Sequence, residues 1–198
     1  MSEKVAAPQF KAFADAYRAR FIAAIEGWDM TALEQVAKVF SDARARKARV
    51  LIAGNGGSAA VANHTECDAT KGTHVAGTPV LDTRSLAANT SVLTALGNDF
   101  GYETVFSKQV EYYGRAGDVL LVVSSSGNSP NVVEAAKSAK ALGMTVIAFV
   151  GFGGGALKGM CDHVLHIPVN DYGVVEDMHQ ASIHLVTQFL RATWEAAA

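Results

Sequence analysis

Cysteine, proline and uncompensated charge are scarce in this sequence. Its 198 residues include 2 cysteines and 4 prolines, and 17 lysines and arginines nearly balance 19 aspartates and glutamates, which leaves a formal net charge of -2. Cys67 and Cys161 alone cannot build a disulfide framework of the secreted type, so we expect a reducing cytoplasm. The short basic segment ARARKAR, residues 43–49, is too small to indicate nucleic-acid binding.

Long apolar runs are also missing. No run approaches the roughly 20 residues that a membrane span needs. The N-terminal segment MSEKVAAPQFKAF contains no uninterrupted apolar core of the signal-peptide type, so we expect neither a membrane protein nor a secreted one. A content of 49% hydrophobic and 18% charged residues is typical of a globular protein, and we expect a single domain over residues 1–198.

The first part of the chain has helical periodicity. Apolar residues recur at helical spacing from Gln9 to about Arg44, and the segment GWDM interrupts them. We therefore expect two helices, the second capped by Asp29.

From residue 47 onward the pattern changes. Short apolar runs rich in β-branched residues alternate with helical segments of about a dozen residues. The runs are ARVLIAG, GTPVLDT, GDVLLVVSSSG, MTVIAFVG and HVLHIPV. This alternation predicts an α/β fold in which helices cover both faces of a parallel sheet. The glycine-rich segment GFGGGALKG, residues 151–159, is expected to form a loop.

Two of the apolar runs end in small polar turns, GNGGS at residues 54–58 and SSSGNS at residues 124–129. Ligands of open parallel sheets bind beyond the carboxyl ends of the strands, where helix N-termini present free N–H groups, so the two turns predict one site. The hydroxyl-rich second turn, with Pro130 in a first helical turn, suits a phosphate monoester. The glycines of the first turn let an anion approach the backbone, and Ser58 is a candidate helix cap. Ordinary capping and turn formation are the alternative interpretations.

His64 and Asp68 are four residues apart in the segment that follows the first turn. At this spacing they share one face of a helix and could bind a metal or a substrate together, although a surface ion pair is the simpler explanation of the spacing alone. Cys67 could reach the same face, but the role of a small buried residue is more common for a cysteine. Glu66 points to the opposite side and is expected to be solvated.

The segment VVEDMHQASIHLVTQFL predicts a helix that contains Glu176, His179 and His184. Glu176 and His184 are eight positions apart, which corresponds to about 12 Å at helical rise, so the two cannot bind one metal from the same helix. A site that uses both residues would need a neighbouring chain and would lie at an oligomer interface. Each histidine alone could instead be a packed helix residue.

Together, these segments resemble the sugar isomerase (SIS) domain family, and within it the phosphoheptose isomerases, which interconvert sedoheptulose 7-phosphate and D-glycero-D-manno-heptose 7-phosphate. The resemblance covers nearly the whole chain and rests on GNGGSAAVANH, ALGNDFGYETVFSKQV, GDVLLVVSSSGNSPNVVEAAKSAKALGMTVIAFVG and EDMHQASIHLV. It implies a three-layer αβα sandwich around a five-stranded parallel sheet, with an N-terminal helical pair, in a homotetramer whose active sites lie between subunits. Residues 1–46 would then serve oligomerisation, and residues 47–198 would form the sheet core and the C-terminal helix.

The resemblance also implies roles for individual residues. Asp68 and His184 match the acid–base pair of the family, and the zinc that some members bind would be held by His64, Asp68, Glu176 and His184. The residues expected to contact the sugar-phosphate substrate are Asn55, Gly56, Gly57, Ser58, Asn98, Asp99, Ser124, Ser125, Ser126, Ser129 and Glu176.

Three positions depart from the family pattern. Asp68 is one methylene shorter than the usual glutamate, Glu176 is charged where a glutamine is usual, and Gly72 replaces an arginine, with Lys71 as a possible substitute. These departures would permit another ketose phosphate as the substrate of an isomerase. A further alternative is a non-catalytic SIS protein that binds sugar phosphates. The presence of His64 and His184 favours the enzyme.

Overall fold

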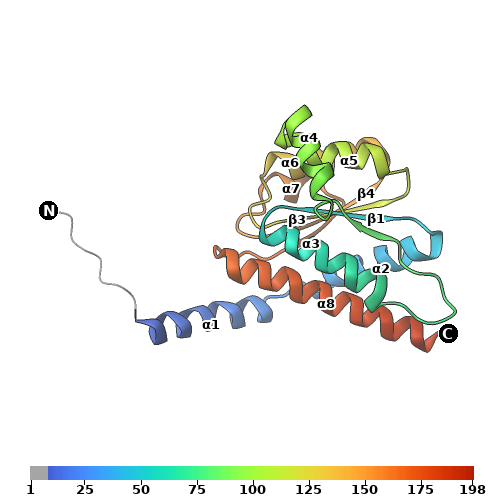
Figure 1. Cartoon of the computed structure of the whole chain (residues 1–198). Helices are drawn as coiled ribbons and strands as arrows, with labels where there is room; N and C mark the ends of the chain where they lie inside the picture. Colours follow the sequence, from blue (N-terminus) through green and yellow to red (C-terminus); the bar gives the residue numbers. More distant parts are fainter. Residues whose placement is uncertain (1–8) are drawn as a thin grey trace.

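The computed structural model describes residues 9–198, which form an α/β fold of three layers (Figure 1). Residues 1–8 of the predicted domain lie outside the described residues. The helices are α1 (Phe10–Glu26), α2 (Met30–Arg46), α3 (Gly57–Cys67), α4 (Thr90–Phe100), α5 (Val105–Tyr113), α6 (Pro130–Ala141), α7 (Gly155–Met160) and α8 (Tyr172–Ala196). The strands are β1 (Val50–Gly54), β2 (Thr83–Ser85), β3 (Val119–Ser124), β4 (Thr145–Val150) and β5 (His163–His166). A π-helical turn, η1 (Asp68–Gly72), continues α3, and a 3-10 turn, η2 (Tyr102–Thr104), precedes α5.

The sheet is parallel throughout and has the order β2-β1-β3-β4-β5. Successive residues of its central strands enter different cores: Val50 and Ile52 pack on one face, and Leu51 and Ala53 pack on the other. Helices α2, α3 and α8 cover the first face, and α4 to α7 cover the second (Figure 1). Because both faces of the sheet are buried, the strands are continuous apolar runs in the sequence. Each fully buried valine, leucine or isoleucine stabilises the fold by about 1.5–3 kcal/mol. The predicted three-layer sandwich is confirmed.

The N-terminal helical pair is also confirmed. Asp29 caps α2, because its carboxylate accepts a hydrogen bond from the Ala32 backbone N–H at 2.9 Å. Helix α1 extends away from the sheet, and its described contacts with the body include a hydrogen bond of 2.8 Å from the Tyr17 hydroxyl to Asp177 (Figure 1). None of the described helices is long and apolar enough to cross a membrane.

Two local predictions are wrong. The run GTPVLDT, residues 77–83, is not a strand over most of its length, because β2 begins only at Thr83. Pro79 lacks a backbone N–H, and its carbonyl accepts a hydrogen bond from Arg44 of α2 at 2.8 Å, so the chain around Pro79 does not pair with β1 and the pairing begins at Thr83, opposite Val50. The segment GFGGGALKG is a loop only in its first half, since α7 begins at Gly155.

Candidate active site

The two polar turns meet where β1 and β3 end, as their positions in the sequence predict. They line a pocket of about 140 Å³, here called the serine pocket. Its lining residues are Asn55, Ser58, Val123, Ser124, Ser125, Ser126, Ser129, Tyr172 and Glu176. Helix α6 begins at Pro130 beside these hydroxyls, so the positive end of its dipole faces the pocket and favours an anion there.

The serine pocket has a buried hydroxyl without a protein partner. Ser125 is 5% exposed, and among the described residues its Oγ makes no hydrogen bond. The neighbouring hydroxyl of Ser124 instead accepts a hydrogen bond from the Gly127 N–H at 3.1 Å. A buried hydroxyl is costly without a partner, so Ser125 is suited to donate to a ligand in this pocket.

Asn55 is held rigidly at the rim of the serine pocket. Its amide exchanges two hydrogen bonds with the amide of Asn131, of 2.8 and 2.9 Å, and its Oδ1 also accepts from the Tyr102 hydroxyl at 3.0 Å. These contacts tie the turn after β1 to α6 and η2, so three elements fix the shape of the pocket.

The glycines of the first turn have different structural roles. Gly56 precedes α3 with φ of 54° and ψ of -121°, a conformation that side chains with a Cβ strongly disfavour. Gly57 faces Glu176, and a Cβ at this position would overlap the Glu176 carboxylate. The prediction that Ser58 caps α3 is wrong, because Gly56 is the capping residue and Ser58 is buried inside the first turn of the helix.

Two predicted substrate contacts lie outside the serine pocket. Asn98 and Asp99 are exposed at the end of α4, where the Asn98 amide donates to the Asp99 carboxylate at 2.9 Å. Neither residue lines the serine pocket.

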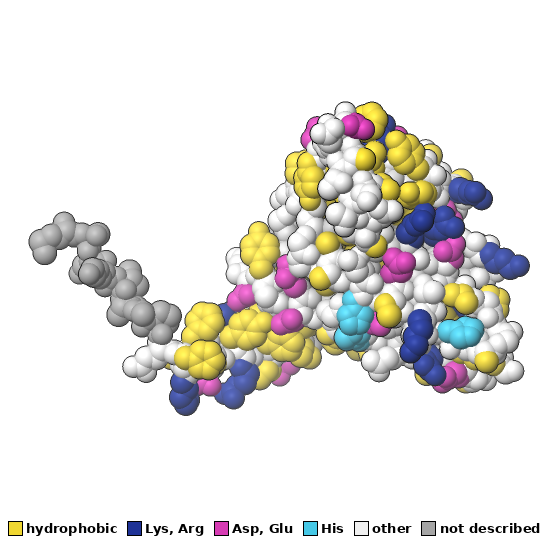
Figure 2. Space-filling model, viewed as in Figure 1, with side chains coloured by type: hydrophobic (Ala, Val, Ile, Leu, Met, Phe, Trp, Pro, Cys, Tyr) yellow, Lys and Arg dark blue, Asp and Glu magenta, His cyan; other side chains and the backbone are white. Residues whose placement is uncertain are grey.

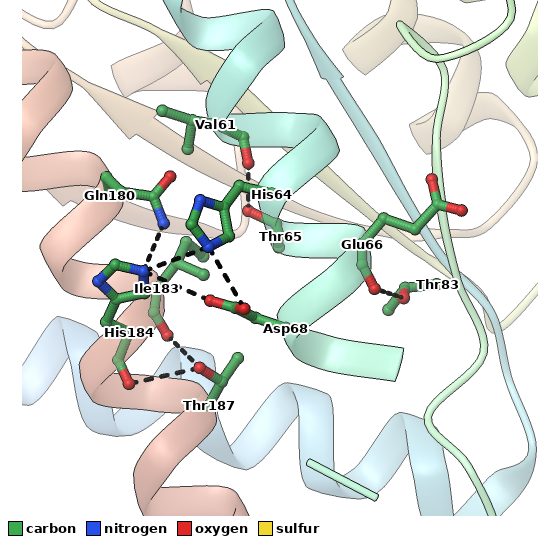
Figure 3. Close-up of polar contacts among 10 residues, drawn as sticks. All are labelled: Val61, His64, Thr65, Glu66, Asp68, Thr83, Gln180, Ile183, His184 and Thr187. Carbon is green, nitrogen blue, oxygen red and sulfur yellow. Dashed lines mark hydrogen bonds and ion pairs between the residues drawn. The ribbon is translucent and has the colours of Figure 1, made fainter. Parts of the chain in front are cut away.

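A second group of side chains, here called the His–Asp cluster, consists of His64, Asp68 and His184 (Figure 3). The two Nε2 atoms lie 3.5 Å apart, His64 Nε2 lies 3.4 Å from one Asp68 oxygen, and His184 Nε2 lies 3.5 Å from the other. Helix α3 supplies His64, Asp68 follows at the start of η1, and α8 supplies His184. Three ligand atoms within 4.8 Å of one another are suited to hold a divalent metal ion.

Glu176 belongs to the serine pocket and is not part of the His–Asp cluster described within this chain. Burial, and secondarily the charge of Asp177, raise the pKa of its carboxyl above the usual value. The sequence spacing predicts that Glu176 and His184 cannot bind one metal from the same helix. The structure places them at different sites of one chain.

A pocket of about 250 Å³ adjoins the His–Asp cluster. It is lined by Asp68, Gly72, His184, Thr187, Gln188 and Arg191. The guanidinium of Arg191 donates to the Gly72 carbonyl at 3.4 Å, so α8 provides a cation beside the position where the sequence has glycine. Lys71, the expected substitute, lines a different pocket with Glu66 and Cys67.

The remaining side chains of α3 differ from expectation. Glu66 is not freely solvated, because its carboxylate accepts a hydrogen bond from the Ser85 N–H at 2.6 Å and so connects α3 to β2. Cys67 is exposed rather than buried, and it lies outside the His–Asp cluster. His179 of α8, by contrast, agrees with the expectation for a single histidine: it is a packed helix residue, fully buried against Phe149 of β4.

Sequence comparison places this architecture among known proteins. The model of the SIS domain matches residues 12–151. The phosphoheptose isomerase of Akkermansia muciniphila is 39% identical over 158 residues, which cover 80% of this chain and 83% of the relative. Phosphoheptose isomerase 1 of Campylobacter jejuni is 40% identical over 158 residues, covering 80% and 84%.

Comparison with solved structures also finds a phosphoheptose isomerase. The solved structure of phosphoheptose isomerase from Neisseria gonorrhoeae superposes with a TM-score of 0.86 at 35% identity, covering 93% of this chain and 100% of that one. The fold, the extent of the match and the level of identity lead to one conclusion. This chain belongs to the SIS domain family and, within it, to the phosphoheptose isomerases, which are aldose–ketose isomerases.

Proposed function

We propose that this protein interconverts sedoheptulose 7-phosphate and D-glycero-D-manno-heptose 7-phosphate by acid–base proton transfer through an enediol. The observation that carries the proposal is the convergence of Asp68 and His184 from two helices, beside a pocket large enough for part of a sugar. The phosphoheptose isomerases that resemble this chain support the choice of substrate.

The serine pocket would hold the phosphate. The hydroxyls of Ser124, Ser125, Ser126 and Ser129, together with the N-terminus of α6, supply the donors that a phosphate monoester needs. Binding energy from this remote group orients the reacting carbons, because it offsets the entropy lost when the sugar is positioned.

The isomerisation moves two protons, and the His–Asp cluster offers a group for each. The Asp68 carboxylate would take a proton from C1 of the ketose and return it to C2. His184 would move the second proton from the C1 hydroxyl to the oxygen on C2. Atoms balance, because C1 loses one C–H and one O–H proton while C2 gains the same two.

The residues His64, Asp68 and His184 also suit zinc, since imidazole and carboxylate are ligands that this ion accepts. When bound there, zinc would polarise the sugar carbonyl and hold its two reacting oxygens together. A ring nitrogen that binds a metal cannot also carry a proton. The acid–base role and the ligand role of His184 therefore exclude each other at Nε2, which is the nitrogen that faces Asp68 and His64.

We further propose a homotetramer with active sites between subunits, in a single domain whose N-terminal helices serve assembly. The exposed apolar side chains of α1 support this proposal. A cytoplasmic location fits the two free cysteines.

Turnover of sedoheptulose 7-phosphate by matched variants tests the proposal. We expect Asp68→Asn and His184→Gln to lower kcat by about 100-fold or more, because each removes one proton-transfer group while conserving size. His74→Gln serves as the control, because His74 is an exposed histidine outside the His–Asp cluster. Wild-type kcat in both cluster variants would refute the assignment of the acid–base pair.

A further inference from the structure

A further pocket, here called the α4 pocket, lies beside the carboxyl end of β2 and shares no residue with the serine pocket or the His–Asp cluster. Its volume is about 400 Å³, which is in the range of small-molecule sites. Its lining residues are Glu66, Arg84, Ser85, Ala88, Asn89, Thr90, Ser91, Gln109 and Tyr113. Most of these side chains are polar, so the pocket suits a hydrophilic ligand.

Arg84 provides a cation at the α4 pocket. Its guanidinium lies over the ring of Tyr113, 4.2 Å from the ring centroid. Among the residues that the structure describes, no carboxylate forms an ion pair with Arg84, although Glu66 lines the same pocket. Stacking occupies the face of the guanidinium and leaves its in-plane N–H groups free to bind an anion.

The N-terminus of α4 adds a second source of positive potential. This helix of 11 residues begins at the pocket with Thr90 and Ser91, which follow the cap residue Asn89. The Asn89 side chain accepts a hydrogen bond from the Val92 N–H at 3.1 Å, so the start of the helix is fixed. The positive end of the helix dipole therefore faces the same pocket as Arg84, and the hydroxyls of Thr90 and Ser91 can donate to an anion there.

Gln109 presents a buried acceptor at the same pocket. It is 2% exposed, and its amide nitrogen donates to the backbone carbonyls of Leu86 and Val105 at 2.9 and 3.0 Å. Because both partners are acceptors, the nitrogen must face them, and the amide oxygen lies on the other side. Within the described part of the chain nothing donates a hydrogen bond to this oxygen, so a hydroxyl of a ligand in the pocket would satisfy it.

Glu66 is a second acceptor at the α4 pocket. One oxygen of its carboxylate accepts a hydrogen bond from the Ser85 N–H at 2.6 Å, which leaves the other oxygen able to accept from a hydroxyl. Figure 3 shows Glu66 on the side of α3 that is turned away from the His–Asp cluster. The pocket thus combines a cationic part with acceptors that would repel a second negative group. A ligand with one anionic group and several hydroxyls matches both parts.

We propose that the α4 pocket binds the phosphate monoester of a polyhydroxy compound at a second site, separate from the serine pocket. The phosphate would accept hydrogen bonds from Arg84 at the N-terminus of α4, and hydroxyls of the ligand would donate to Gln109 and Glu66. A phosphate is favoured over a carboxylate because its oxygens can use the guanidinium, the helix N-terminus and two hydroxyls together. The proposal goes beyond the proposed function, which uses none of these residues.

Calorimetric titration with D-glucose 6-phosphate tests the proposal in a variant whose serine pocket is blocked. Ser129→Asp places a negative charge among the serine hydroxyls and suits the N-cap position of α6, so it should exclude phosphate and still fold. We expect this variant to keep one site per chain. Adding Arg84→Gln should weaken that binding at least about tenfold, because a hydrogen bond between charged groups is lost. The control is Arg115→Gln, at an exposed arginine outside both pockets, which should leave the affinity unchanged.

The wild type provides a second measurement that does not depend on Ser129→Asp. Its titration should show two sites per chain, of which Arg84→Gln removes one. Inorganic phosphate should bind to the α4 pocket more weakly than D-glucose 6-phosphate, because it has no sugar hydroxyls for Gln109 and Glu66. A single site in the wild type, or an affinity that Arg84→Gln leaves unchanged, would overturn the proposal. Equal affinities for the two phosphates would overturn the role of the two acceptors.

Failure of this proposal is distinguishable from failure of the proposed function, because turnover does not enter the titration. Binding that depends on Arg84 in a protein that does not convert sedoheptulose 7-phosphate would support the α4 pocket and reject the substrate. Turnover in a protein that has no second phosphate site would reject the α4 pocket alone.

Discussion

His179 lies five residues before His184 on α8, on the face of the helix that packs against the sheet. It is fully buried, and within the described residues neither ring nitrogen has a hydrogen-bond partner of standard geometry. Burial lowers the pKa of His179 to about 4, and the backbone of Val150 opposes this shift only in part. The imidazole is therefore neutral in the folded protein at neutral pH.

This burial predicts an acid-sensitive fold. The unfolded chain protonates His179 near pH 6.5, whereas the folded protein does so only near pH 4, so stability is complete above 6.5 and falls as the pH drops through this window. The loss from this residue should approach about 3 kcal/mol near pH 4 and about 2 kcal/mol at pH 5. Urea unfolding in chelator at pH 7.5 and pH 5, compared between wild type and His179→Leu, measures it.

The variant should lose less stability than the wild type between these two pH values, by about 2 kcal/mol. Its lower stability at pH 7.5 does not affect this difference, because packing defects are independent of pH. An equal pH dependence of the two proteins would show that His179 does not titrate as its burial requires.

The sequence predicts residue types at the site better than it predicts their contacts. The spacing of His64 and Asp68 indicates a shared helix face, since helical geometry alone determines it. Ser58 fails as a helix cap because the conformation of Gly56 decides where α3 begins. Arg191 has no motif of its own, and no spacing in the sequence indicates its contact with Gly72.

Among the helices and strands, α8 contributes side chains to both pockets and to the His–Asp cluster. Within its 25 residues, Glu176 lines the serine pocket, His184 belongs to the His–Asp cluster, and Arg191 lines the pocket beyond. Its N-terminus is fixed by Asp171, which caps the helix and forms an ion pair with Arg20 of α1 at 3.0 Å. A rigid helix of this length keeps the serine pocket and the His–Asp cluster of one chain at a constant separation.

This arrangement predicts a role in substrate binding for Arg191. The pocket that it shares with Asp68 and His184 is suited to the end of the sugar remote from the phosphate, where a guanidinium can hydrogen-bond to hydroxyls. We expect Arg191→Leu to raise KM for sedoheptulose 7-phosphate about tenfold, since a hydrogen bond to a charged group contributes about 1.5 kcal/mol or more.

The affinity for inorganic phosphate, measured by calorimetry, should not change in Arg191→Leu, because the serine pocket is intact. Arg191→Lys should restore part of the lost affinity for the sugar phosphate. A KM equal to that of the wild type in Arg191→Leu would remove this residue from the binding site.

The elements themselves were predictable wherever periodicity is strong. Both N-terminal helices and four of the five expected strand runs coincide with observed elements, because burial on both faces makes the strands continuously apolar. The strand β2 is short and lies at the edge of the sheet, so its position depends on tertiary contacts such as the hydrogen bond between Glu66 and the Ser85 N–H. Single-sequence patterns do not report contacts of this kind.

In the whole molecule, helix α1 presents an exposed apolar surface. Its apolar side chains include Phe10, Phe13 and Ile22, which are 85%, 55% and 48% exposed. Figure 2 shows hydrophobic side chains gathered along this projecting helix. Large exposed apolar patches mark interaction surfaces, and assembly with further copies of this chain would cover this one.

Light scattering should therefore give the mass of a tetramer for the wild type. Phe13→Glu with Ile22→Glu should yield smaller species, because two charges would be buried without partners in the interface. Lys38→Glu, an exposed change on α2, is the control that alters charge without touching the apolar patch. A monomeric wild type, or a tetramer that tolerates both glutamates, would contradict this assembly.

We expect Asp68 and His184 to transfer protons between C1 and C2 of a ketose phosphate. Conversion of sedoheptulose 7-phosphate in D₂O, followed by proton NMR, tests this proton transfer. The product should be an aldose phosphate that carries solvent deuterium at C2, because the proton removed from C1 exchanges with water while it resides on the base. Aldose formed without deuterium would indicate a hydride shift, and no aldose at all would reject the isomerase.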